Sequence, residues 1–165
     1  MSDTPRLERV DWIVVHHSVT PPDWTLADID RMHAARNFRW RLGERSGSVG
    51  YHRLVFADGT VQEGRPLELQ GAHVGPHRIA GQHWPGLNAC SIGVCFVGDF
   101  TEHGWTFAQA LAGLDEIERL CRRFGLSAEQ VQGHGEYPGA ATACPGAQIC
   151  MTAIRVELAH RLRSP

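Results

Sequence analysis

The chain has 165 residues, of which 42% are hydrophobic and 21% charged, and its 16 basic and 18 acidic residues leave a net charge of −2. This length suits one domain with a single core, and the charge balance argues against nucleic acid as a partner, because phosphate binding requires clustered positive charge. Every basic residue apart from histidine is arginine, which excludes a lysine general acid.

The cysteines argue against a secreted protein, because they are odd in number and irregularly spaced, unlike a disulfide framework. They are Cys90, Cys95, Cys121, Cys144 and Cys150. The apolar stretch at residues 12–15 is too short for the core of a signal peptide, and no span is long enough to cross a membrane. We therefore expect a protein that is made in the cytoplasm without a signal peptide and is not inserted in the membrane.

In chain order, residues 10–16 come first as a β-branched run that predicts a buried strand ending at His16. Residues 25–36 predict a helix with Thr25 and Asp28 in its first turn. One face of this helix carries Ile29, Met32, His33 and Arg36. Residues 39–48 are basic and contain Gly and Ser, which predicts a mobile surface loop.

Residues 49–64 predict a hairpin, because an Asp-Gly pair between two apolar runs is a strong turn signal. Tyr51 and His52 are expected on its first strand, facing opposite sides. Residues 65–88 are rich in Gly, Pro and His and lack periodicity, which predicts a long ordered loop of the kind that often carries function.

Two amphipathic helices and another strand are predicted in the second half of the chain. Residues 91–98 predict a fully buried strand, residues 106–124 a long helix that ends at Gly125, and residues 150–162 a closing helix. Strands mixed with helices indicate an α/β fold for residues 1–165, a single domain in which a central mixed β-sheet is flanked by helices.

Six of the ten histidines lie at strand ends or in Gly-rich loops, where functional sites tend to form. These six are His16, His17, His52, His73, His77 and His134. The other four are expected on the surface or on a helix face, and they are His33, His83, His103 and His160.

A Gly- and Pro-rich segment joins His134 to Cys144. Together with His16 or His17 it supplies two imidazoles and a thiolate, the mixed donor set that zinc prefers, and three ligands leave the fourth tetrahedral position for water or substrate. Adjacent strand residues point to opposite faces, so one of the two histidines is expected to bind, and spacing alone does not choose between them. The simpler alternative is a loop histidine and a buried thiol, but the glycines and prolines that fix the backbone favour a site.

Several ordered motifs extend this pattern over nearly the whole chain. They are Val15-His16-His17-Ser18, Gly50-Tyr51-His52, Asp58-Gly59-Thr60-Val61, Gly71-Ala72-His73, Asn88 with residues 91–98, and Gly133-His134 through Cys144-Pro145-Gly146. In this order they resemble the zinc N-acetylmuramoyl-L-alanine amidases, which include phage amidase endolysins and peptidoglycan recognition proteins. The resemblance implies the fold of the recognition proteins, one Zn²⁺ ion, and cleavage of the amide between N-acetylmuramic acid and L-alanine in bacterial peptidoglycan.

The resemblance also assigns roles to individual residues. It selects as metal ligands His16, His134 and Cys144. His17 becomes a neighbour of the metal site, Tyr51 matches the family's catalytic tyrosine, and Thr142 is a second hydrogen-bond donor for catalysis. Glu136 either orients His134 or is a solvated loop carboxylate.

The substrate groove is expected between the loops at residues 39–48 and 65–88. The expected contacts to carboxylates or sugar are Arg65, His73 and Asn88.

Two departures from the family pattern bear on the function. Thr142 stands where phage members often carry lysine, so it can donate a hydrogen bond but supplies no charge. Cys95 and Cys144 stand where the cytoplasmic muropeptide-recycling amidases of the superfamily carry a glutamate base and an aspartate ligand, which argues against that branch. The long interval between His134 and Cys144, in contrast, resembles the corresponding interval in the recycling amidases.

We favour a phage or prophage endolysin that acts as a monomer on the cell wall after its release from the host cytoplasm. Three alternatives remain. The first is a non-catalytic peptidoglycan-binding module, which typically lacks the cysteine ligand. The second is a structural zinc site, which needs a fourth ligand, and His17 is the only close candidate for it. The third is a recycling amidase that acts on soluble muropeptides.

Overall fold

A central five-stranded sheet organises the fold in the computed structural model, which describes residues 3–163. Its strands lie in the order β5-β4-β8-β1-β9 and comprise β1 (Trp12–His17), β4 (Arg53–Val55), β5 (Val61–Glu63), β8 (Ser91–Phe96) and β9 (Val131–Gly133). β1 pairs in parallel with β8 and β9, β4 pairs in parallel with β8, and β5 pairs antiparallel with β4. The predicted mixed sheet is therefore confirmed.

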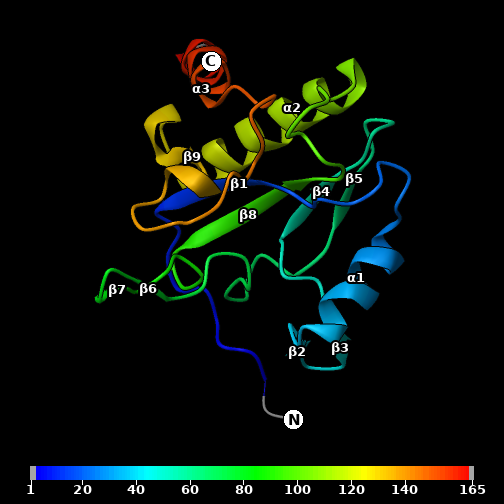
Figure 1. Cartoon of the computed structure of the whole chain (residues 1–165), viewed down its shortest axis with the longest axis vertical. Coiled ribbons are helices and arrows are strands. Elements are labelled where there is room, and N and C mark those ends of the chain that lie inside the picture. The colour runs from blue at the N-terminus through cyan, green and yellow to red at the C-terminus, as the bar shows by residue number, and fades with distance from the viewer. Residues whose placement is uncertain (1–2, 164–165) are drawn as a thin grey trace.

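Three helices cover this sheet on its two faces (Figure 1). They are α1 (Leu26–Ala35), α2 (Phe107–Phe124) and α3 (Met151–Arg163). Ile13 and Val15 of β1 face α2 and α3 and belong to the main core cluster. Because side chains alternate along a strand, Val14 and His16 face the opposite side, the side on which Ile29 of α1 packs. His16 is thus directed away from the main core.

The helix boundaries agree with the predicted signals. The Thr25 hydroxyl accepts a hydrogen bond from the Asp28 backbone N–H at 3.3 Å, and the Asp28 carboxylate accepts one from the Thr25 backbone N–H at 2.9 Å. This capping box begins α1. α2 ends at Gly125, whose φ of 67° is in the left-handed region that glycine adopts without strain.

The prediction of a mobile loop at residues 39–48 is wrong. This segment forms a hairpin of β2 (Trp40–Leu42) and β3 (Arg45–Gly47). Trp40 is only 6% exposed, and its indole ring packs against Gly47, where an added Cβ would lie 2.7 Å from the ring. A buried tryptophan therefore fixes a segment whose charged residues suggested mobility.

The segment 65–88 is a mostly irregular segment that also contains a short hairpin of β6 (His77–Ile79) and β7 (Gln82–Trp84). Tyr51 and His52 form a bend just before β4 rather than part of its strand. Among the described residues, no helix is long and apolar enough to cross a membrane.

Candidate metal centre

The carboxyl ends of two parallel neighbours, β1 and β9, place the first two candidate ligands side by side. Val15 pairs with Gly133, so that His16 and His134 follow next to each other, and their ring centroids are 4.8 Å apart. Cys144 provides the third donor, with its Sγ 3.5 Å from His16 Nδ1. One ligand atom from each of these three residues lies within 4.8 Å of the other two.

The Gly-rich loop returns the chain to His134 at close range. The Gly135 backbone N–H donates a hydrogen bond to the Cys144 carbonyl at 2.6 Å, and a Cβ on Gly135 would lie 2.7 Å from the Thr142 carbonyl oxygen. A side chain at this position would therefore push the two ends of the loop apart. This close approach explains why glycine stands at position 135.

The electrostatics of the three residues fit a bound cation. Burial lowers the pKa of His16 well below its usual value, with His73 and His134 adding to the effect, and burial also lowers the pKa of His134. Both imidazoles are thus neutral at pH 7, the form that binds metals. Burial raises the pKa of the Cys144 thiol to about 12, and a metal ion supplies the positive charge that makes such a thiol ionise.

The two neutral imidazoles and one thiol therefore fit zinc, and His16 would hold the ion through the Nδ1 that faces Cys144.

His17 does not complete this group. Its ring lies on the other side of β1, where Nδ1 accepts a hydrogen bond from the Phe100 backbone N–H at 3.2 Å. Its own backbone N–H donates to Cys144 Sγ at 3.4 Å, so His17 contacts the thiol through its main chain. Within residues 3–163, no fourth His, Cys, Asp or Glu joins the group, so a tetrahedral ion held by these three residues would keep one position open.

The group opens into a pocket of about 460 Å³. Of the predicted site residues, it is lined by His16, His17, Tyr51, His73, Asn88, His134, Thr142 and Cys144. The Tyr51 ring lies 5.1 Å from the His16 ring. Burial, with Cys95 and Cys144 close by, raises the pKa of Tyr51 well above its usual value. Thr142 is exposed, and its hydroxyl accepts the Cys144 backbone N–H at 3.2 Å.

Arg65 lies away from this pocket. It is 3% exposed, and its guanidinium donates to the carbonyls of Val49, Gln70 and Phe38 at 3.1, 2.7 and 2.7 Å. These bonds tie together three segments of the chain. The expected substrate contact is thus occupied by the protein's own backbone.

Glu136 is an exposed carboxylate, and its bonds lie in the turn that carries His134. Its carboxylate accepts the Gly133 backbone N–H at 2.8 Å and forms a two-pronged ion pair with Arg155 of α3 at 2.8 and 2.9 Å. One of these bonds closes the short 3₁₀ turn at His134–Glu136 onto Gly133, and the others join the turn to α3. Glu136 therefore fixes the backbone that carries His134. It does not bond to the imidazole.

Sequence reasoning missed several residues at the pocket. Met32, Arg36 and Phe38 line it. Met32 and Arg36 belong to the helical face that the sequence predicts. This face ends in an arginine, which is exposed in the structure, and that arginine was the signal in the sequence that could have indicated these residues. Val19 is 61% exposed at the rim with a φ of 54°, and nothing in the sequence indicates this backbone conformation. His33 lies on a helix face, as expected, but this face is buried: His33 is 1% exposed, and its Nδ1 accepts the Gly50 N–H at 3.0 Å.

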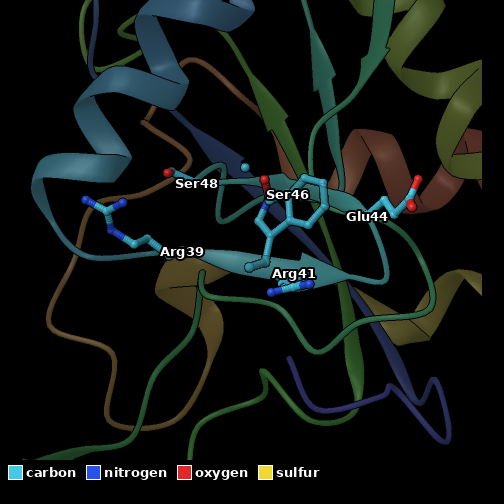
Figure 2. Close-up of a pocket in the computed structure, with 7 residues that line it drawn as sticks. Arg39, Arg41, Glu44, Ser46 and Ser48 are labelled. Atoms are coloured by element: carbon cyan, nitrogen blue, oxygen red, sulfur yellow. The ribbon is translucent and has the colours of Figure 1, made fainter. Parts of the chain in front are cut away.

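A second hollow, of about 360 Å³, lies on the β2–β3 hairpin. Figure 2 shows that the side chains of Arg39, Arg41 and Glu44 point in different directions around it. No set of charged groups converges on one point there, so we assign no chemistry to this hollow.

With the geometry established, comparison with known proteins decides the family. The family profile described as N-acetylmuramoyl-L-alanine amidase matches residues 6–147. The chain belongs to this family. A peptidoglycan-recognition protein of Drosophila melanogaster is 30% identical over 88% of this chain and 76% of its own length. The endolysin of Escherichia phage T7 is 34% identical over 59% of this chain and 54% of its own length.

Known structures agree with this membership. The N-acetylmuramoyl-L-alanine amidase LysC from Clostridium intestinale superposes with a TM-score of 0.76 at 26% identity, over 96% of this chain and 92% of that protein. The bumblebee recognition protein PGRP-SA superposes with a TM-score of 0.70 at 24% identity, over 94% of this chain and 87% of that protein. The expected fold of the recognition proteins is thereby confirmed.

Proposed function

We propose that the protein is a zinc-dependent N-acetylmuramoyl-L-alanine amidase that cleaves the amide between N-acetylmuramic acid and L-alanine of the peptidoglycan stem peptide. The observation that carries this proposal is the open group of His16, His134 and Cys144, which faces a pocket beside Tyr51 in a chain of the amidase family. A closed structural zinc site is disfavoured, because the His17 ring is turned to the opposite side of β1.

His16, His134 and Cys144 would hold the metal ion. When bound there, zinc supplies a Lewis acid and lowers the pKa of a water in its open position to about 7. The chain's own contribution is to keep two imidazoles neutral and to hold the thiol in place with the His17 backbone N–H.

Tyr51 is the proposed catalytic hydrogen-bond donor. Its phenol is protonated at neutral pH, since burial moves its pKa further above an ordinary value of 10.0, and its ring lies beside the His16 ring at the pocket wall. A hydroxyl in this position can donate to the oxygen of the scissile amide as negative charge develops on it. Thr142, exposed on the opposite loop, is the proposed second donor, and its hydrogen remains available because its oxygen accepts the Cys144 N–H.

We infer a role as an endolysin, with residues 1–165 forming one amidase domain that acts as a monomer on the cell wall. The similarity to LysC and to the T7 endolysin supports this inference. A non-catalytic peptidoglycan-binding protein is the second candidate, because the match to the Drosophila recognition protein covers 88% of the chain. Cys144 favours the enzyme, since binding modules typically lack this ligand. Cys95 and Cys144 disfavour a muropeptide-recycling amidase.

The test uses intact peptidoglycan incubated with the zinc-loaded protein, with and without a chelator. Mass spectrometry of the soluble products should show stem peptides with a free N-terminal alanine, released only when zinc is present. Binding to peptidoglycan without release of any peptide would replace the enzyme with the binding module.

A further inference from the structure

His73, the expected substrate contact, lies behind a metal ligand. Its Nδ1 is 3.0 Å from His16 Nε2, and the two rings meet edge to face at 86°. The other nitrogen of the same ring, His16 Nδ1, faces Cys144. Because the two nitrogens lie on different edges of the imidazole, His73 and the metal position are on opposite sides of His16.

A close-fitting niche holds the His73 ring in this place. A Cβ on Gly93 would lie 2.8 Å from the ring and a Cβ on Gly71 would lie 2.3 Å from it, so both glycines provide the space that the ring fills. The Asn88 side-chain oxygen accepts the backbone N–H groups of His73 and Val74 at 2.9 and 2.8 Å. The expected substrate contact Asn88 therefore fixes the backbone of His73.

The tautomers of the two rings follow from these contacts. A neutral imidazole carries one proton, and the nitrogen without it is the one that can bind a metal. If His16 carries its proton on Nε2, it donates to His73 Nδ1 and leaves its own Nδ1 free beside Cys144. His73 then carries its proton on Nε2, which is buried and has no hydrogen-bond partner among the described residues.

We propose that His73 is a positioning residue, which accepts the His16 Nε2–H and so holds His16 in the tautomer and orientation that present Nδ1 to the metal. Metal-binding histidines usually donate this second N–H to a carboxylate, a carbonyl or water. Here a second histidine accepts it. At 8% exposure, with Nδ1 already bonded, His73 has little left to offer a substrate.

The inference rests on the metal site of the proposed function but not on peptidoglycan as the substrate, so its test measures zinc binding. His73→Leu removes the acceptor and keeps a similar volume, whereas His73→Asn places an amide oxygen near the position of the lost Nδ1. We expect His73→Leu to weaken zinc binding about 10- to 100-fold. His73→Asn should keep most of the wild-type affinity.

Competition with a chromophoric chelator measures the affinities, and circular dichroism of each sample gives the folded fraction. His33→Leu is the matched control, because His33 is also buried and also accepts a hydrogen bond through Nδ1, but it bonds to Gly50 instead of His16. The control should lose stability and keep its zinc affinity. Nitrogen-15 NMR of the metal-free wild type should show His16 protonated at Nε2, and His73→Leu should show a mixture of tautomers.

Three results would overturn the proposal: unchanged zinc affinity in folded His73→Leu, an equal loss in His73→Asn and His73→Leu, or a His16 proton on Nδ1 in the wild type. If the wild-type protein bound no zinc, the result would instead contradict the proposed function itself. The two failures are thus distinguishable.

Discussion

Tyr51 illustrates how neighbouring side chains set the state of a single residue. Burial raises its pKa, and the Cys95 thiol and the Cys144 thiol, both close by, raise it further. The phenol therefore stays a hydrogen-bond donor throughout the neutral pH range.

Tyr51→Phe tests this donor. The substitution keeps the ring that packs beside His16 and removes only the hydroxyl, so kcat should fall about 10²- to 10³-fold. Zinc affinity, measured by competition with a chelator, should be unchanged because Tyr51 does not belong to the ligand group. Retention of full kcat would show that Tyr51 only lines the pocket.

His33 gives the fold a dependence on pH. Burial lowers the pKa of His33 to about 4 in the folded protein, whereas the ordinary value is 6.5. Between these values the unfolded chain binds more protons at this residue than the folded chain does, so stability falls as the pH falls from 6.5 to 4. When His33 is protonated completely, the free energy of unfolding is lower by about 3 kcal/mol.

His33→Asn keeps an acceptor for the Gly50 N–H but cannot titrate. Urea unfolding of the metal-free protein at several pH values between 7 and 4 should show a smaller loss of stability in the variant than in the wild type. Parallel pH profiles for the two proteins would show that His33 makes no such contribution.

At the scale of elements, the long helices and the two six-residue strands could be predicted from the sequence, since each carries a periodic pattern or a continuous apolar run. The hairpins β2–β3 and β6–β7 and the strand β9 could not be, because three residues are too few for a period and their pairing depends on partners far along the chain.

The residue types of the metal site could be identified, because thiol and imidazole side chains that cluster near strand ends and glycines are typical of metal ligands. The choice of His16 over His17 came from family resemblance alone, and the structure shows the physical reason in the alternation of β1.

The role of Arg65 is a property of packing that no local pattern contains. Its three backbone acceptors lie in the segments around Phe38, Val49 and Gln70, which meet only in the folded chain. Sequence reasoning placed a charged residue in a Gly-rich region at the surface, but burial with complete hydrogen bonding gives it a structural task.

Arg65→Ala should therefore lower the free energy of unfolding by about 3 kcal/mol or more, because each buried acceptor left without a donor costs about 1–3 kcal/mol. Arg65→Lys should recover little of this loss, since an ammonium group lacks the planar fork that reaches three carbonyls. Chemical denaturation measures both variants. If Arg65→Ala instead had unchanged stability and a raised KM, the result would support the substrate contact that the sequence predicts for Arg65.

The turn that carries His134 is joined to α3 by the pair of Glu136 and Arg155. Both side chains are partly exposed, so Arg155→Ala should cost only about 1 kcal/mol of stability, with a smaller loss at high salt. Thermal unfolding in low and high salt measures this difference. An equal loss in both buffers would mean that the Arg155 hydrogen bond to the Val131 carbonyl, at 3.2 Å, matters more than the charge.

For the whole molecule, the three candidate ligands connect the end of strand β1 and the turn after β9 to the loop before α3. A ligand that binds only the folded state stabilises it by an amount set by its concentration relative to Kd, about 4 kcal/mol at a thousandfold excess. Thermal unfolding with zinc and with a chelator should therefore differ by several degrees. In His16→Ala or Cys144→Ser this difference should be much smaller, and a wild type insensitive to the chelator would contradict a metal site.

The strand order has a consequence for the synthesis of the chain on the ribosome. β1 leaves the ribosome first, but both of its neighbours come much later, β8 from residue 91 and β9 from residue 131. The third ligand, Cys144, emerges later still. A nascent chain interrupted before residue 131 lacks both a complete sheet and the group of three ligands, and one interrupted between residues 133 and 144 still lacks the cysteine. Truncated products of translation therefore could not assemble the group of His16, His134 and Cys144.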